Sequence, residues 1–328
     1  MSAALVSTCF CEAADIDAFL DAVLAQTRQP DEIVIVDAGS GDGTLERIRE
    51  RAAQAPHLRL IVEPGANRSR GRNLAIQSCS ADIIAVTDVG CLPCPSWFER
   101  IIAPLERRVG QASPEDTTGQ ARRLSYADVV AGYYRATPVT LWQAAIAAAT
   151  VPLADEVDAA TFLPSARSVA FRREAWERAG GYPERASHNE DTPFGLALKG
   201  SGAQFVFEPE AVVEWLPQAS VRALFRQFWR YALGDAQEGI WVRHYAKAYL
   251  GLLASMALVF AYGDGAWPLA LWGFPLLGLA YWVRHALRAR HRTRSLGAVL
   301  LAPAANLIVD AAHLCGYTRG FVGRPRCR

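Results

Sequence analysis

The sequence carries almost no net charge, because 34 lysines and arginines face 33 aspartates and glutamates, which gives a formal net charge of +1. Proteins that bind nucleic acid through its phosphates present a strongly basic surface. The balanced composition argues against such a surface, and we therefore expect no nucleic-acid partner.

The chain also lacks a disulfide framework, because its seven cysteines are odd in number and do not have the spacing of a secreted domain. No charged segment with an apolar core and a cleavage site precedes the first apolar run, so we expect the N-terminal part to be cytosolic and reducing. Cys91 and Cys94 form a C-x-P-C pattern that is also typical of a thiol redox site, which stays open as an alternative. Zinc binding is disfavoured, because no second Cys/His pair has suitable spacing.

Strands and helices alternate in the first third of the chain. Short apolar runs predict strands at residues 3–8, 32–37, 58–62 and 82–87. Helical spacing of apolar residues predicts helices at residues 14–26, 45–53, 70–78 and 96–107. This alternation predicts βαβ units in an α/β fold with a mostly parallel, Rossmann-like sheet, whose ligand binds outside the carboxyl ends of the strands.

The middle of the chain continues this pattern less regularly. After a polar loop at residues 110–123, we predict a strand at 127–134 and an Ala-rich helix at 139–150. An irregular acidic segment follows at 151–163, and then a strand at 168–171 and a helix at 172–179. Residues 204–215 indicate two short strands around Pro209, and residues 220–244 a long amphipathic helix.

The composition becomes apolar beyond residue 244. The runs at 248–263 and 265–283 are separated by one charge, Asp264, and their lengths suit a membrane-spanning hairpin. The Arg- and His-rich segment at 284–294 indicates the cytoplasmic side. A third run at 295–313 contains Asp310 and His313, and the sequence leaves open whether it spans the membrane or lies at its interface. A buried helical subdomain is the alternative to all of these spans.

Two aspartates lie where predicted strands end, which is where a ligand of such a sheet is expected. Asp37 and Asp88 could accept hydrogen bonds from a nucleobase or ribose, or bind a divalent ion. A turn-initiating aspartate is the alternative for each. The segment at 65–73 contains three arginines ahead of a helix, which suits a diphosphate, although a solvated basic loop fits the pattern equally well.

An acidic pair, Glu190-Asp191, opens another predicted helix. Free backbone N–H groups stabilise carboxylates there, so an acidic helix cap is the simplest interpretation, whereas the neighbouring motifs make Asp191 a candidate general base. On the helix at 220–244, Gln227 and Arg230 share one face, and Arg230 is placed to reach a diphosphate. An interfacial aromatic belt with a snorkelling arginine is the alternative for this helix.

Taken together, these motifs resemble family 2 glycosyltransferases, which are inverting enzymes of the GT-A fold, over roughly the first three-quarters of the chain. The segments that carry the resemblance are Val36-Asp37-Ala38-Gly39-Ser40-Gly41-Asp42-Gly43-Thr44, Arg72-Asn73, Asp88-Val89-Gly90, Gly180-Gly181-Tyr182, Glu190-Asp191 and Gln227-Phe228-Trp229-Arg230-Tyr231. Each motif is weak alone, but their order and spacing are specific in combination.

The resemblance implies roles for individual residues. Asp37 would contact the base of a nucleoside-diphosphate sugar, Asp88 would face the ribose or a metal ion, and Asp191, beside Glu190, would deprotonate the acceptor. The remaining implied donor-site residues are Thr8, Gly39, Arg72 and Asn73. The implied diphosphate or acceptor contacts are Gln227, Arg230 and His188.

One departure from the family pattern concerns the metal. Gly90 stands where the second aspartate of Asp-x-Asp is expected, and glycine offers no ligand. Dependence on Mn²⁺ or Mg²⁺ is therefore open: another carboxylate could complete the site, or arginines such as Arg72 and Arg230 could balance the diphosphate charge. Gly90 also keeps a catalytically inactive module that binds nucleotide-sugar or a partner at the membrane as an alternative.

The predicted organisation is a glycosyltransferase domain at residues 1–243 and a membrane-associated helical region at 244–328. Two or three C-terminal segments would not enclose a polysaccharide channel, so we expect transfer of a single sugar to a lipid-linked or membrane-proximal saccharide. The expected location is the inner or plasma membrane, with the catalytic domain facing the cytoplasm.

Overall fold

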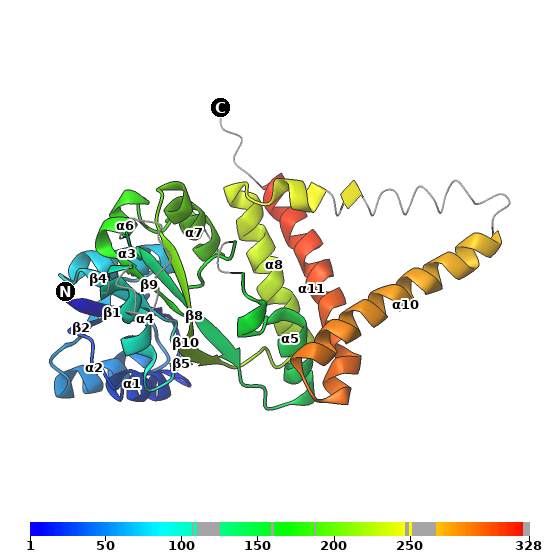
Figure 1. Ribbon diagram of the computed structural model, residues 1–328. Helices are drawn as coiled ribbons and strands as arrows, with labels where there is room; N and C mark the ends of the chain where they lie inside the picture. Colours follow the sequence, from blue (N-terminus) through cyan, green and yellow to red (C-terminus); the bar gives the residue numbers. More distant parts are fainter. Residues whose placement is uncertain are drawn as a thin grey trace, which may run out of the picture. The chain divides into compact units, whose positions relative to one another are not determined.

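The computed structural model describes residues 1–106, 108–109, 125–158, 161–186, 188–246, 249–250 and 267–323. The chain forms two compact units, shown in Figure 1. The first comprises residues 1–135 and 154–215, and the second comprises residues 136–153 and 216–328. Residues 216–243 therefore fold with the C-terminal helices, and the functional boundary at residue 243 stays a prediction.

The first unit is built on an eight-stranded sheet with the order β3-β2-β1-β4-β9-β8-β10-β5. The strands are β1 (Ala3–Cys9), β2 (Glu32–Asp37), β3 (Leu58–Val62), β4 (Ile83–Val86), β5 (Cys91–Pro93), β8 (Val129–Ala136), β9 (Val169–Arg172) and β10 (Phe205–Trp215). Strands β6 (Arg108–Val109) and β7 (Ser125–Tyr126) form a separate pair. The polar loop predicted at 110–123 lies outside the described residues.

The α/β class is confirmed, and the sheet is mixed. Strands β3, β2, β1 and β4 are parallel, as the alternation of strands and helices predicts. Strand β9 then pairs antiparallel with β4 and with β8, and β10 pairs antiparallel with β5. The parallel half is the βαβ part of the chain, and its carboxyl ends carry Asp37 and Asp88.

Helices cover both faces of this sheet. They are α1 (Ile16–Leu24), α2 (Thr44–Gln54), α3 (Arg68–Ser78), α4 (Trp97–Glu106), α6 (Arg173–Arg178) and α7 (Asp191–Gly200), with a short 3₁₀ turn η1 (Ala154–Glu156). Successive strand residues point to opposite faces. In β1, for example, Leu5 joins the core that includes residues of α1 and α4, and Val6 joins the core that includes residues of α3, α6 and α7.

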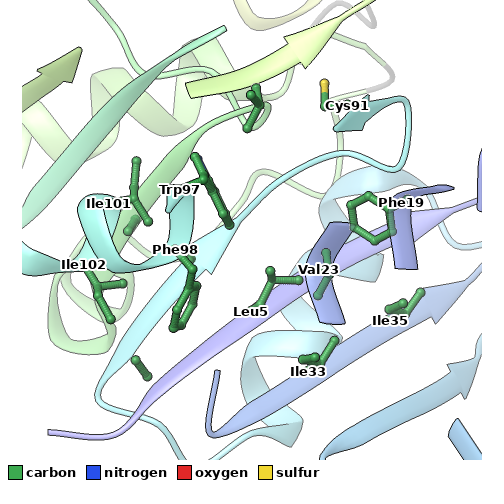
Figure 2. Close-up of a cluster of buried hydrophobic side chains, with 14 of the residues drawn as sticks. Leu5, Phe19, Val23, Ile33, Ile35, Cys91, Trp97, Phe98, Ile101 and Ile102 are labelled. Atoms are coloured by element: carbon green, nitrogen blue, oxygen red, sulfur yellow. The ribbon is translucent and has the colours of Figure 1, made fainter. Parts of the chain in front are cut away.

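The core on the α1 and α4 face consists of large aliphatic and aromatic side chains, as Figure 2 shows. Phe19 and Leu5 pack there with Trp97 and Phe98, and all four are fully buried. Burial of each such side chain contributes about 1.5–3 kcal/mol. The Trp97 indole N–H donates to the Ser168 hydroxyl at 2.8 Å, so this polar atom is satisfied inside the core.

The predicted break at Pro209 is wrong, because β10 runs without interruption from Phe205 to Trp215. Proline cannot donate a backbone hydrogen bond, so a strand tolerates it where no partner needs that donor. Strand β5 pairs only with residues 213–215 of β10, which leaves Pro209 away from the β5 ladder.

The second unit is helical in its described part. It contains α5 (Leu141–Thr150), α8 (Val221–Glu238), α10 (Trp267–Arg292) and α11 (Leu296–Val322). Helix α8 ends at Gly239, whose φ of 75° is a left-handed C-cap, so it is shorter than predicted. Helix α10 continues through most of the Arg-rich segment, because arginine is a good helix former and Ala289 packs in the core of this unit.

The predicted membrane segments have different outcomes. Most of the run at 248–263 lies outside the described residues. Among the helices of the described part, α11 alone is long and apolar enough to cross a membrane, and about a third of its most apolar window is buried. This observation is weak support for a membrane span, because core helices of soluble proteins have the same composition.

Candidate active site

Asp37 is the last residue of β2, and its side chain stabilises the turn that follows. Its carboxylate accepts hydrogen bonds from the backbone N–H groups of Gly39 and Ser40 at 2.8 and 2.7 Å and from the Ser40 hydroxyl at 2.6 Å. Gly39 has a φ of +94°, which glycine adopts without strain. Asp37 is fully buried, so these contacts match the turn-forming alternative, and its contact with a nucleobase stays a prediction.

Helix α3 approaches the end of β1 closely. A Cβ atom on Gly71 would lie 2.7 Å from the Thr8 methyl group, so only glycine fits here without a shift. The helix begins at Arg68, two residues before the predicted start, and Asn67 caps it by accepting the Arg70 N–H at 2.9 Å. The predicted basic loop is therefore partly the first turn of a helix.

Arg72 lies at the centre of the site, on the buried face of α3. One guanidinium nitrogen donates to Glu190 at 2.6 Å and lies 3.4 Å from Asp191, and another donates to Asp88 at 2.7 Å. The guanidinium also stacks over the Tyr182 ring at 5.3 Å. The side chain is only 1% exposed, so these contacts favour an organising role inside the protein over direct binding of a diphosphate.

Asn73, the neighbour of Arg72, fixes the Gly-Gly-Tyr turn. Its amide donates to the Tyr182 carbonyl at 2.9 Å, and its carbonyl accepts the Tyr182 N–H at 2.9 Å. Gly180 and Gly181 both have positive φ, which allows the chain to reverse at this point. Asn73 thus places Tyr182 under Arg72, and its predicted role in binding the donor stays a prediction.

The predicted helix at the Glu190-Asp191 pair is confirmed. Glu190 is the N-cap of α7 and Asp191 is its first residue. One Asp191 oxygen accepts the Ala166 backbone N–H at 3.0 Å, while the other faces Arg72. The Asp191 side chain is 25% exposed, whereas Glu190 is buried, so Asp191 is the member of the pair that solvent or a substrate reaches.

The surroundings of Asp191 raise its pKa to about 6. Burial is the largest cause, and the negative charges of Glu190 and Asp88 add to it, while Arg72 opposes both. A carboxylate with a pKa near 6 is still mostly ionised at neutral pH and is a stronger base than an ordinary aspartate. This combination suits removal of a proton from a hydroxyl group.

Asp88 follows β4, and two arginines of α3 and one from the segment before β9 act on it. Burial would raise its pKa, but the positive charges of Arg72, Arg167 and Arg68 outweigh this effect and lower the pKa. The side chain is 36% exposed. Arg167 was missed by the sequence analysis, and its guanidinium stacks on the rings of Tyr134 and Trp215 at 5.1 and 5.0 Å.

The residues around Asp88 do not fit a divalent metal ion. One Asp88 oxygen is engaged by Arg72, Gly90 supplies no ligand, and the nearby arginines repel a cation. Within the described part of the chain, no group of three or more His, Cys, Asp and Glu side chains is arranged to hold a metal ion. The donor set therefore differs from the hard, oxygen-rich sites that Mg²⁺ and Mn²⁺ prefer.

The structure contradicts the redox alternative. Cys91 is buried in β5, and burial together with the charge of Asp88 raises its pKa to about 12. Burial also raises the pKa of Cys94. A redox site needs a low-pKa thiolate, so Cys91 and Cys94 are structural residues.

The remaining predicted contacts are Gln227, Arg230 and His188. Gln227 and Arg230 lie on α8 of the second unit, where the Gln227 amide donates to the Tyr231 hydroxyl at 2.9 Å. His188 lies in the first unit, two residues before Glu190, and is half-buried. The roles of all three in diphosphate or acceptor binding stay predictions.

The chain is similar to several known proteins. It is 24% identical to the succinoglycan biosynthesis protein ExoA of Rhizobium meliloti over 97% of this chain and 94% of that protein. It is 34% identical to the glycosyltransferase AglE of Haloferax volcanii over 29% of this chain and 32% of that protein. The mannosyltransferase PcManGT from Pyrobaculum calidifontis, solved in complex with GDP-Man and Mn²⁺, has the same fold, with a TM-score of 0.56, 21% identity, and coverage of 97% of this chain and 86% of that chain.

Two family profiles match successive parts of the chain. The profile of glycosyl transferase family 2 matches residues 4–122, and that of glycosyl transferase family group 2 matches residues 147–307. The first match contains Asp37, Arg72 and Asp88, and the second contains Asp191. The protein is therefore a transferase with a GT-A fold, and it belongs to the family 2 glycosyltransferases.

Proposed function

We propose that this protein transfers a sugar from a nucleoside-diphosphate sugar to a saccharide hydroxyl, with inversion at the anomeric carbon and Asp191 as general base. The acceptor oxygen forms a bond to the anomeric carbon while the bond from that carbon to the diphosphate oxygen breaks. The acceptor proton passes to Asp191, and the nucleoside diphosphate leaves with the bonding electrons.

The observation that carries this proposal is the link that Arg72 makes between Asp88 and the Glu190-Asp191 pair. Asp88 follows a parallel strand at its carboxyl end, where such sheets bind nucleotides. Asp191 is partly exposed, is held by the Ala166 N–H, and has a pKa of about 6. A base placed in this way contributes about 10²–10⁴-fold to the rate.

In this proposal arginines balance the charge of the leaving diphosphate. Arg68 is exposed at the first turn of α3, and its charge lowers the pKa of Asp88, so it lies near the place proposed for the nucleotide. Backbone N–H groups at a helix start add to the attraction for phosphate. Arg230 is a further candidate that rests on the family resemblance alone.

The acceptor and location are inferred from composition and relatives. We infer a lipid-linked or membrane-proximal saccharide acceptor and a catalytic unit that faces the cytoplasm. The apolar C-terminal helices and the similarity to a succinoglycan biosynthesis protein support this inference.

The test is sugar transfer by the purified full chain with a panel of nucleoside-diphosphate sugars. We expect Asp191→Asn to bind the preferred nucleoside diphosphate as wild type does and to lose at least about 100-fold in kcat. Asp17→Asn, an exposed carboxylate on α1, is the matched control and should keep full activity. NMR of the product should show the inverted anomeric configuration, and retention of configuration would refute the mechanism.

A binding module without catalysis is the second candidate, and Gly90 is the observation that favours it. A module of this kind would bind a nucleoside diphosphate but would not release it from a nucleotide-sugar with any acceptor. Turnover that depends on Asp191 would exclude this candidate.

A further inference from the structure

Arg167 lies across from Asp88 at the carboxyl edge of β4. Strand β9 pairs antiparallel with β4, and Val86 is opposite Val169 in this pair. Continuing the register by two residues places Asp88 opposite Arg167. Residues that are opposite each other in an antiparallel pair direct their side chains to the same face of the sheet. A ligand bound beside Asp88 is therefore within reach of Arg167.

Two aromatic rings orient the Arg167 guanidinium. It lies over the Tyr134 ring at 5.1 Å and over the Trp215 ring at 5.0 Å, and these two rings pack edge to face at 6.4 Å. One of its N–H groups also donates to the Ser165 hydroxyl at 3.4 Å. Contacts over a ring hold an arginine as a cation, whereas its N–H donors lie in the guanidinium plane and suit a phosphate. The aromatic contacts thus fix the cation without themselves consuming its donors.

The segment that carries Arg167 also holds the proposed base. The Ala166 N–H donates to Asp191 at 3.0 Å, and the Ser165 hydroxyl lies 3.5 Å from the same carboxylate oxygen. On the other side of Arg167, the Ser168 hydroxyl accepts a hydrogen bond in the core at 2.8 Å. The backbone of Arg167 is therefore anchored on both sides, and its position relative to Asp191 is fixed with it.

Arg68 and Arg167 approach Asp88 from different sides. Arg68 belongs to α3, which packs against β1 and β2, and Arg167 precedes β9. Strand β4 lies between β1 and β9 in the sheet, so Asp88 lies between these two arginines. Burial would raise the pKa of Asp88, but the charge of Arg167, second only to that of Arg72, helps to lower it. Arg68 and Arg167 thus both act on the place proposed for the nucleotide.

We propose that Arg167 binds the β-phosphate of the donor, which is the phosphate bonded to the sugar, while Arg68 faces the nucleoside side of the diphosphate. The acceptor is deprotonated by Asp191, so the sugar and its β-phosphate lie nearer to the segment at 165–168 than the α-phosphate does. When the bond from the anomeric carbon to the phosphate oxygen breaks, the electron pair stays on that oxygen, and Arg167 offsets the charge that develops there. The inference rests on the proposed function and adds a residue to its site.

Binding of nucleotides with one and with two phosphates separates this role from a structural one. The probes are ADP, CDP, GDP and UDP and the four corresponding monophosphates, added to the purified full chain in EDTA and again in Mn²⁺ and measured by calorimetry. We expect Arg167→Met to weaken binding of the preferred diphosphate about 10–150-fold, which is the range for a hydrogen bond to a charged group, and to change binding of the matching monophosphate less than about threefold.

Two further variants complete this comparison. Arg135→Met is the matched control, because this arginine is exposed on β8 directly after Tyr134 and pairs with Glu214 at 2.6 Å. It should bind both nucleotides as wild type does. Arg167→Lys keeps the charge but loses the planar donors, so it should recover part of the affinity for the diphosphate. If Arg167→Met does not fold, the same comparison of diphosphate with monophosphate is decided on Arg167→Lys.

The possible results separate this inference from the proposed function. Equal losses for diphosphate and monophosphate, or no loss of either, would overturn the role of Arg167 and leave the proposed function intact. Diphosphate binding by wild type that requires Mn²⁺ would also overturn it, because a metal ion would then hold the phosphates. A wild type that binds none of these nucleotides in either condition would refute the proposed function and the inference together.

The pH profile of sugar transfer gives an independent readout of the same role. Arg167→Met should lower kcat at saturating donor by at least about tenfold, because the leaving phosphate loses a cation where its charge develops. The acidic limb of the profile should stay at the pH found for wild type, because the ionisation of Asp191 responds mainly to burial, Arg72 and the neighbouring carboxylates. A limb that moves to higher pH would show that Arg167 acts on the base, and this would overturn its assignment to the β-phosphate.

Discussion

Replacement of Arg72 gives the sharpest test of the site. This side chain is buried and is the shared cationic partner of Asp88, Glu190 and Asp191. Arg72→Met removes the charge but keeps an unbranched side chain similar in length to the apolar part of arginine. Because it leaves three carboxylates without this partner in a largely buried position, we expect a loss of about 3–5 kcal/mol in the free energy of unfolding.

The same variant changes the pH dependence of activity in a defined direction. Arg72 lowers the pKa of Asp191, so its removal raises that pKa above about 6. An opposite charge within about 4–6 Å shifts the pKa of a carboxylate by about 1–3. The base works in its ionised form, so activity is lost as the pH falls through the pKa. The acidic limb of the pH profile of kcat should therefore move to higher pH in the variant.

Arg72→Lys separates this electrostatic effect from a general loss of structure. Lysine keeps the positive charge but cannot donate to Asp88 and Glu190 from a planar fork. We expect it to recover part of the stability and to shift the acidic limb less than methionine does. The assays are chemical denaturation and pH–rate profiles between pH 5 and 9 for folded protein. A folded Arg72→Met variant whose acidic limb coincides with that of wild type would refute the coupling between Arg72 and Asp191.

Three further predictions concern Asp191, Gly71 and Gly90. The raised pKa of Asp191 means that its ionisation destabilises the fold above about pH 6. Asp191→Asn should therefore raise the free energy of unfolding at pH 8 by about 1–2 kcal/mol, whereas Asp17→Asn should not raise it. A gain that persists at pH 4, where the native carboxyl is already protonated, would contradict this cause. Gly71→Ala should lower the free energy of unfolding by about 1–2 kcal/mol, because the new methyl group overpacks against the Thr8 methyl group. In a double-mutant cycle, Thr8→Ser should restore most of this loss. Strictly additive effects of the two substitutions would show that this contact is not the cause. A side chain at Gly90 meets open space, so Gly90→Asp should fold. Calorimetry should show that donor binding by this variant is at least about tenfold more sensitive to Mn²⁺ than donor binding by wild type. A wild type that already requires Mn²⁺ would refute the arginine-based account.

Most elements of the first unit could be predicted from the sequence, because their apolar residues follow strand or helix periods and their ends carry turn residues. Strand β2 was located to the residue, since Pro30 precedes it and the Asp37 turn follows it. The predicted interruption at Pro209 was wrong, and the cause is tertiary. Whether proline breaks a strand depends on which neighbour needs its donor, and the pairing of β10 with β5 is a tertiary fact that no local pattern contains.

The site was predicted as separate residues, and its organisation was only partly accessible. Asp88 and the Glu190-Asp191 pair are more than a hundred positions apart, so only the family resemblance placed them at one site. Arg72 was grouped with Arg68 and Arg70 as a basic loop. A helical reading of the same residues shows that Arg72 lies four positions before the buried Ile76, on the face that packs against the sheet, and this spacing was the signal for its internal role.

Arg72 and Gly90 both affect the balance of charge around Asp88. Asp88, Glu190 and Asp191 contribute three formal negative charges, and Arg72, Arg68 and Arg167 supply three positive charges that act on Asp88. An aspartate at position 90 would make this group negative and would attract a divalent cation. Gly90 leaves this further negative charge out, so an incoming diphosphate meets less repulsion, and the exposed Arg68 can contact it without a bridging ion. The glycine and the arginines are therefore two parts of one arrangement, and Gly90→Asp should disturb both together.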